Sequence, residues 1–177
     1  MDNDSGRSLL RTQILYPGLW YRFRFSGVPT CDSNKIGEIP WLFQTNFCDF
    51  HRYHLGFTVS SEYKQYSNAS LHKHIVRTTC LDPFSSNAGV ARPGDVCVTV
   101  TGHNRGSGIQ HHIIPATHLK PANPTGKNQL CLVIKGARAG EVVVVKKCQK
   151  NTRTIVSHDE ESISFDDVCL AYASSLL

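Results

Sequence analysis

Long apolar segments are missing from this 177-residue sequence. No stretch approaches the run of about 18 apolar residues that a membrane-spanning helix requires. The N-terminus, MDNDSGRSLLRTQ, is polar and begins acidic, whereas a secretory signal begins basic and continues apolar. We therefore expect a soluble, non-secreted protein with no membrane partner. A chain of this length can bury a substantial core in one or two domains.

Paired cysteine motifs are missing as well. The seven cysteines are widely spaced, and none forms Cys-x-x-Cys. An odd count without paired spacing argues against a disulfide framework and is typical of a reducing compartment. Cys48, His51 and His54 have a spacing that resembles metal ligands, but tetrahedral zinc needs four ligands, and no recognised second pair follows. We predict no metal site and no cofactor.

Acidic residues are nearly missing between Lys120 and Arg153. This stretch contains eight Lys and Arg residues against one acid, Glu141, which gives a formal charge of +7. A basic patch on a small β-module is expected of a phosphate-backbone binder, and the competing interpretation is a solvated basic surface. The candidate nucleic-acid-binding residues are Lys135, Arg138, Lys146, Lys147, Lys150 and Arg153.

Two apolar runs lie within this basic stretch, at 130–134 and 142–145. They are rich in β-branched residues, above all in the four valines of the second run, and are joined by a short segment that contains Gly136 and Gly140, so they predict a β-hairpin whose glycines supply positive φ. Further strands are expected at 152–157 and 162–170.

The N-terminal half also has β-type patterning. Residues 1–15 are predicted to be a flexible tail, and the alternation at 19–25 predicts a half-buried strand. Residues 38–60 are the richest in aromatics, which could stack on nucleic-acid bases, although we favour burial in a core. Residues 81–93 are rich in turn formers and predict a connecting loop and an internal boundary.

A self-comparison predicts a repeated unit. When 96–106 is written above 130–140, Cys97 coincides with Cys131, and the turn glycines Gly102 and Gly106 coincide with Gly136 and Gly140. The similarity recurs in the closing segments 114–119 and 165–170. Short strands joined by turns suit small twisted barrels. We predict a mainly β fold with a β-rich module at 16–120, which includes a degenerate unit at about 91–120, and a complete barrel at 121–173.

The repeated pattern resembles the KOW module, an SH3-like barrel found in NusG-type transcription elongation factors and in several ribosomal proteins. The matching residues are Gly94-Asp95-Val96, Gly102 and Gly106 in the first unit, and Gly136 and Gly140 in the second. The tandem arrangement is most similar to the larger subunit of the eukaryotic factor of this class, particularly its divergent fungal relatives. The second unit has Val142-Val143 where the family usually has a further glycine, and residues 1–90 show no NusG-type N-terminal domain.

The resemblance implies tandem SH3-like barrels, the first abbreviated or completed by the N-terminal half. It further implies a non-catalytic module in transcription elongation that binds the RNA or DNA backbone in the nucleus, or alternatively in the cytoplasm. RNA polymerase or other elongation-complex proteins would be additional partners. The alternative function is a protein-interaction module in which the acidic segment 159–167 neutralises the basic strands or docks on another subunit.

Catalysis is the least supported class of function. Four histidines, at 103, 111, 112 and 118, cluster near Asp95 and Cys97. The sequence contains no nucleophile elbow, phosphate-binding loop or paired-carboxylate motif. We predict that the protein is not an enzyme.

Overall fold

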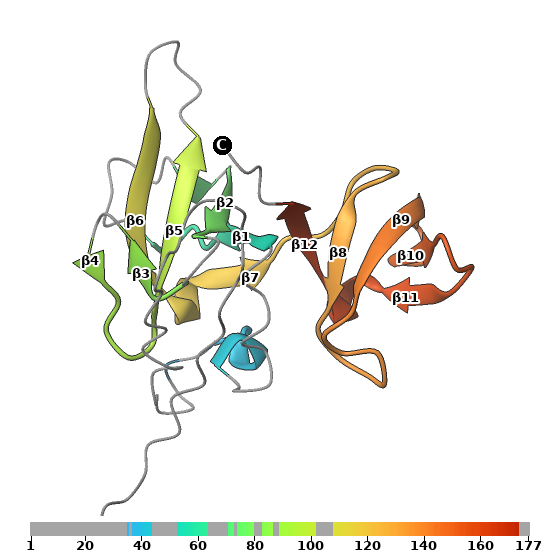
Figure 1. Ribbon diagram of the computed structural model, residues 1–177, viewed down its shortest axis with the longest axis horizontal. Coiled ribbons are helices and arrows are strands. Elements are labelled where there is room, and N and C mark those ends of the chain that lie inside the picture. The colour runs from blue at the N-terminus through green and yellow to red at the C-terminus, as the bar shows by residue number, and fades with distance from the viewer. Residues whose placement is uncertain are drawn as a thin grey trace, which may run out of the picture.

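The computed structural model describes residues 35, 37–43, 53–63, 71–72, 74–79, 83–86, 89–101 and 108–173. Within these ranges the chain is mainly β, with antiparallel strands and short 3-10 turns as its helical elements (Figure 1). The prediction of a mainly β fold is confirmed. No helix in these ranges has the length and hydrophobicity needed to cross a bilayer.

The N-terminal unit is a meander of four strands, closed by a fifth strand that pairs with the first. The first four strands pair in the order β1–β2–β5–β6, and β7 pairs with the opposite edge of β1. A small hairpin, β3–β4, lies in the connection between β2 and β5. The elements are β1 (Tyr53–Val59), β2 (Ile75–Thr78), β3 (Ser85–Ser86), β4 (Gly89–Val90), β5 (Asp95–Thr101), β6 (Ile109–Pro115), the 3-10 turn η5 (Ala116–His118) and β7 (Leu119–Pro121).

The C-terminal unit repeats this succession. Four strands pair in chain order, a 3-10 turn follows, and the final strand pairs with the first. The hairpin predicted from the runs 130–134 and 142–145 is confirmed as β8–β9. The elements are β8 (Leu130–Val133), β9 (Val142–Gln149), β10 (Thr154–Ser157), β11 (Ser162–Ser164), the 3-10 turn η6 (Phe165–Asp167) and β12 (Val168–Ala173).

The structure changes how the sequence repeat is aligned. In the N-terminal unit, β5 is the third strand of the meander, whereas β8 is the first strand of the C-terminal unit. The alignment of 96–106 with 130–140 therefore matches the third strand of one unit with the first strand of the other. This happens because a short apolar strand followed by a glycine-containing loop occurs at more than one place in the chain. The closing segments do correspond, since η5 leads into β7 as η6 leads into β12.

Both units belong to one ten-stranded sheet, which runs β11–β10–β9–β8–β12–β1–β2–β5–β6, with β7 attached to β1. In the described residues, the outer strands β11 and β6 each pair with a single neighbour, so the path stays open and no closed barrel is found. Figure 1 shows β12 between the two units.

Strands β8 and β12 separate two hydrophobic cores. Side chains alternate across a strand, so Leu132 and Cys169 face the N-terminal core while Cys131 and Leu170 face the C-terminal core. All four are at most 2% exposed. Burial on both faces explains why these strands are continuously apolar, whereas a strand with one wet face alternates apolar and polar residues.

The joint between the units is built around β1. Its first half pairs with β12 and its second half with β7 and β2. The Gly56 carbonyl accepts a hydrogen bond from the Ala122 amide at 3.0 Å and lies 3.3 Å from the Cys169 thiol. The Leu170 amide in turn donates to the Ala122 carbonyl at 2.8 Å. Backbone bonds therefore tie the two units together.

Other sequence expectations have mixed outcomes. Residues 81–93 do not divide the chain, because β2 and β5 on either side of them pair with each other. The described aromatics of 38–60 belong to the core, where Trp41 stacks on Phe57 with ring centroids 6.1 Å apart and Phe43 packs on Phe84. The tail at 1–15, the strand at 19–25, Cys48, His51, Gly102 and Gly106 lie outside the described residues.

Candidate functional site

Strand β9 carries the centre of the basic stretch, and a β-bulge sets the direction of its two lysines. Lys147 pairs with Val156, and Val145 pairs with Ser157, so Lys146 is an extra residue opposite β10. A bulge of this kind turns two successive side chains toward the same face. Val145 is buried, while Lys146 and Lys147 are both exposed. The sequence alternation is thus broken in favour of two adjacent surface cations.

Three exposed lysines have backbone positions near the C-terminal end of β9. Lys147 lies on the strand and Lys150 lies in the turn to β10. The segment 124–129 runs alongside, because the Asn128 amide donates to the Val145 carbonyl at 2.7 Å and the Cys148 thiol lies 3.8 Å from the Gly126 carbonyl. This places Lys127 beside the same strand end. All three lysines are exposed, and none makes an ion pair within the described residues. We call Lys127, Lys147 and Lys150 the lysine end.

The turn that carries Lys150 is tied down by side-chain hydrogen bonds. The Thr152 and Thr154 hydroxyls lie 2.8 Å apart, and both reach the Gln149 amide oxygen, at 3.2 and 3.3 Å. Arg153 has a φ of +52°, which closes the turn in the left-handed region. Its carbonyl accepts from the Phe165 amide at 2.8 Å. The lysine end therefore stands on a fixed backbone.

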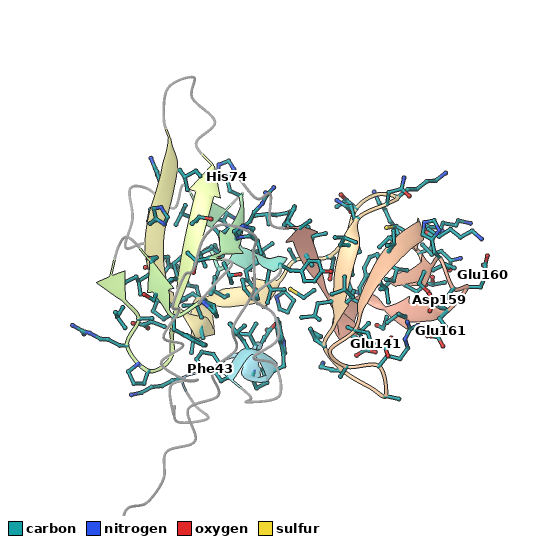
Figure 2. All side chains as sticks on the ribbon, in the orientation of Figure 1. Phe43, His74, Glu141, Asp159, Glu160 and Glu161 are labelled. Carbon is teal, nitrogen blue, oxygen red and sulfur yellow. The ribbon has the colours of Figure 1, made fainter. Side chains whose placement is uncertain are left out.

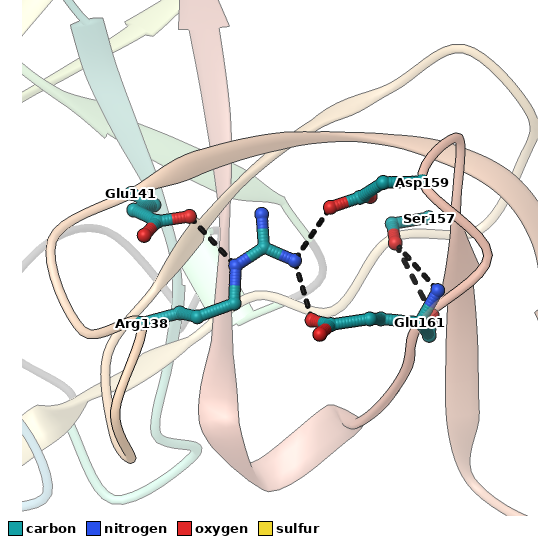
Figure 3. A network of polar contacts seen from close by, with 5 residues as sticks. All are labelled: Arg138, Glu141, Ser157, Asp159 and Glu161. Carbon is teal, nitrogen blue, oxygen red and sulfur yellow. Dashed lines mark hydrogen bonds and ion pairs between the residues drawn. The ribbon is translucent and has the colours of Figure 1, made fainter.

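Arg138 lies on the β8–β9 loop, before β9 begins. Its Nε donates to Glu141 at 2.6 Å, and its Nη1 donates to Asp159 at 2.6 Å and to Glu161 (Figure 3). The loop is shaped by Gly136 and Gly140, whose φ angles are 85° and 98°. Three carboxylates around one guanidinium leave this cluster with a formal charge of −2, so Arg138 does not add to a cationic surface.

The carboxylates are presented by the turn between β10 and β11. Ser157 is fully buried, and its hydroxyl lies 3.2 Å from both the amide and the carbonyl of Glu161. Its backbone amide donates to the Glu161 carbonyl at 2.9 Å, and the His158 amide donates to the Val144 carbonyl at 3.1 Å. We call residues 157–161 the acidic turn. Because these bonds hold the backbone of the turn on β9, its carboxylates stay close to the basic strand.

The network also changes the ionisation of its members. Hydrogen bonds from the Ser157 hydroxyl and then from the Arg138 guanidinium lower the pKa of the Asp159 carboxyl. Hydrogen bonds to Glu161, Glu141 and Asp159 raise the pKa of Arg138. Each change favours the charged form of the group that titrates. Asp159 and Arg138 consequently both favour their charged forms in the folded protein.

Two further candidate cations are paired. Lys146 contacts Glu160 of the acidic turn, and Arg153 lies 3.1 Å from Asp166. Figure 2 shows Glu141, Asp159, Glu160 and Glu161 gathered along one side of the C-terminal unit. Residues 121–173 contain seven Lys and Arg residues and six Asp and Glu residues, a formal charge of +1. The charge excess of the basic stretch is thus almost cancelled by the acidic residues of segment 159–167, which follows it.

The six candidate residues therefore do not form one surface. Arg138, Lys146 and Arg153 are paired with carboxylates, whereas Lys147 and Lys150 belong to the lysine end. Lys135 is exposed on the β8–β9 loop, at the opposite end of β9. Sequence reasoning did not assign Lys127 to the binding set. Its signal was weak, since a single lysine in a Pro- and Gly-containing connection has no neighbour in sequence that marks it.

The environments of Cys131 and Cys148 disfavour the thiolate form. Burial raises the pKa of the Cys131 thiol to about 12, and burial also raises that of Cys148. Both thiols are therefore protonated at neutral pH and poor nucleophiles. His111 and His112 lie on β6, and burial together with His111 lowers the pKa of His112. In the described part of the chain, no three His, Cys, Asp or Glu residues are grouped to hold a metal ion.

Comparison with protein-family models finds no match, and a search of curated proteins finds no significantly similar relative.

Proposed function

We propose that this protein is a non-catalytic binding module that holds the phosphate backbone of RNA or DNA at the lysine end of its C-terminal unit. The observation that carries the proposal is that Lys127, Lys147 and Lys150 lie near one strand end, are exposed and make no ion pair with a described residue. Lysines on a rigid β-surface bind phosphates as point charges and do not read sequence. Binding is consequently weak, salt-sensitive and indifferent to base sequence.

The fold assigned in this proposal is a pair of SH3-like units of the KOW type. Its support is the shared succession of four paired strands, a 3-10 turn and a closing strand that returns to the first. In this view β1 and β2 complete the N-terminal unit, which the sequence repeat alone left abbreviated. A nuclear role in transcription elongation, with RNA polymerase or another elongation-complex protein as partner, rests on the KOW resemblance.

The test is a fluorescence anisotropy titration of a labelled oligouridylate between about 50 and 200 mM salt. Three phosphate contacts on a single strand predict a slope of log K against log salt of about −2. Lys147→Ala with Lys150→Ala should weaken binding and flatten the slope. The matched control, Arg92→Ala with Lys120→Ala, removes two cations from the N-terminal unit and should change neither value much. Absence of binding at the lowest salt, or equal effects of the two double variants, contradicts the proposal.

A second candidate function is a protein-interaction module, and the pairing of basic strands with the acidic turn favours it. A formal charge of only +1 over 121–173 reduces the long-range attraction for a polyanion. The two candidates separate in one experiment. Capture of a discrete protein from nuclease-treated lysate, together with no anisotropy change on oligouridylate, supports protein interaction and contradicts phosphate-backbone binding.

A further inference from the structure

The acidic turn lies against the same strand that carries the lysine end. Lys146 precedes Lys147 directly, and the bulge turns both side chains outward. Lys147 makes no ion pair with a described residue, whereas Lys146 contacts Glu160. Lys146 and Lys147 thus lie next to each other on one face, but only Lys146 is paired with a described carboxylate.

We infer that the acidic turn is an autoinhibitory contact, in which carboxylates of the chain occupy cations that would otherwise extend the phosphate-binding surface. This inference rests on the proposed function and concerns regulation of that same site. Lys146 is the main masked residue, because it is continuous with Lys147. Arg138 is masked more completely, since three carboxylates contact its guanidinium.

The phosphate backbone of a nucleic acid could displace Glu160 from Lys146. The side chains of Lys146 and Glu160 are 49% and 67% exposed. Exposed ion pairs are individually weak and are screened by salt, so several phosphates acting together compete with a single carboxylate. The backbone of the turn stays in place because buried Ser157 holds Glu161, so the competing carboxylate remains close and returns when the polyanion leaves.

Arg138 should respond differently from Lys146. Neutralising Asp159 leaves Glu141 and Glu161 on the guanidinium, whereas neutralising Glu160 removes the one carboxylate that contacts Lys146 in the described residues. Glu160→Gln should therefore increase binding more than Asp159→Asn, although both variants change the net charge equally. Nonspecific attraction would give equal effects.

The experiment compares Glu160→Gln with Glu62→Gln in the same oligouridylate titration. Glu62 is exposed in the N-terminal unit and makes no ion pair with a described residue, so its variant controls for the loss of one negative charge. Release of Lys146 adds one phosphate contact, so Glu160→Gln should tighten binding at low salt and steepen the slope by about 0.7. Glu62→Gln should leave the slope unchanged.

A double-variant cycle decides whether the gain comes through Lys146. In a Lys146→Ala background, Glu160→Gln should tighten binding no more than Glu62→Gln does. Suppose that the wild type binds through Lys147 and Lys150, but Glu160→Gln and Glu62→Gln have the same affinity and salt slope. The inference that Glu160 masks Lys146 is then wrong, and the proposed function stands. If neither the wild type nor Glu160→Gln binds at low salt, both are wrong.

Discussion

The Arg77 guanidinium lies over the ring of Tyr172, with its Cζ 3.6 Å from the ring centroid. Arg77 is on β2 and Tyr172 is on β12, so this cation–π contact joins the two units across β1. On β1 itself, Gly56 pairs with Arg77 and His54 pairs with Tyr172. A Cβ at Gly56 would lie 3.1 Å from Cε2 of the Tyr172 ring, so the missing side chain gives the ring its space.

The Arg77–Tyr172 contact should couple the stabilities of the two units. Arg77→Met keeps the apolar stem and removes the charge, and Tyr172→Leu removes the ring. A double-variant cycle in urea should give a coupling of about 0.5–1 kcal/mol, the usual value for an exposed cation–π pair. Arg77→Met combined with the distant Glu62→Gln should be additive. A coupling indistinguishable from that control pair would contradict the contact.

Gly56→Val should destabilise the protein by about 1–3 kcal/mol. The valine side chain has no free space between the two units, so neighbouring side chains would have to shift. The added Cβ alone would lie 3.2 Å from Ile75 Cγ2 and 3.4 Å from Leu170 Cβ. Gly126→Val is the matched control, since nothing lies within 4 Å of a Cβ at that position. The free energies of unfolding in urea measure both effects. Equal losses for the two variants would show that the close approach at Gly56 has no energetic consequence.

The strands of the C-terminal unit were accessible to sequence reasoning because their pattern is local. Leu130–Val133 is apolar and Val142–Gln149 begins with four β-branched valines, and the glycines between the two strands adopt positive φ. The register of the repeat was not accessible, because whether β5 corresponds to β8 or to β10 depends on pairing with strands distant in sequence. The apolar run Val96-Cys97-Val98 is equally suited to any position in a meander.

The candidate site was predictable in composition but not in pairing. Counting charges located the basic stretch and the acidic segment that follows it. Which cations meet carboxylates depends on the bulge at Lys146 and on the Ser157 hydrogen bonds, and neither has a local sequence signature. The sequence also shows that β8 and β12 are continuously apolar. The cause is their burial between two cores, which depends on the pairing of β12 with the distant strand β1.

Asp159→Asn should lower stability at neutral pH, and the difference from the wild type should shrink in acid. Ser157 and Arg138 hold the pKa of Asp159 below its ordinary value of 3.8, so the folded state favours the carboxylate. A lowered folded pKa contributes stability above about pH 4, and this contribution is lost as pH falls through the lowered value. Asparagine cannot ionise, so the variant lacks the contribution at every pH.

Urea midpoints of the wild type and Asp159→Asn, measured from pH 7 down to about pH 2, test this directly. The other ionisable residues in and around the turn are the same in both proteins, so the difference between the two curves reports on Asp159. These residues are Arg138, Glu141, Lys146, His158, Glu160 and Glu161. Asp167→Asn is the control for removing one carboxylate that makes no ion pair with a described residue. A gap between wild type and Asp159→Asn that stays constant to the lowest pH would mean that Arg138 and Ser157 do not stabilise the Asp159 carboxylate.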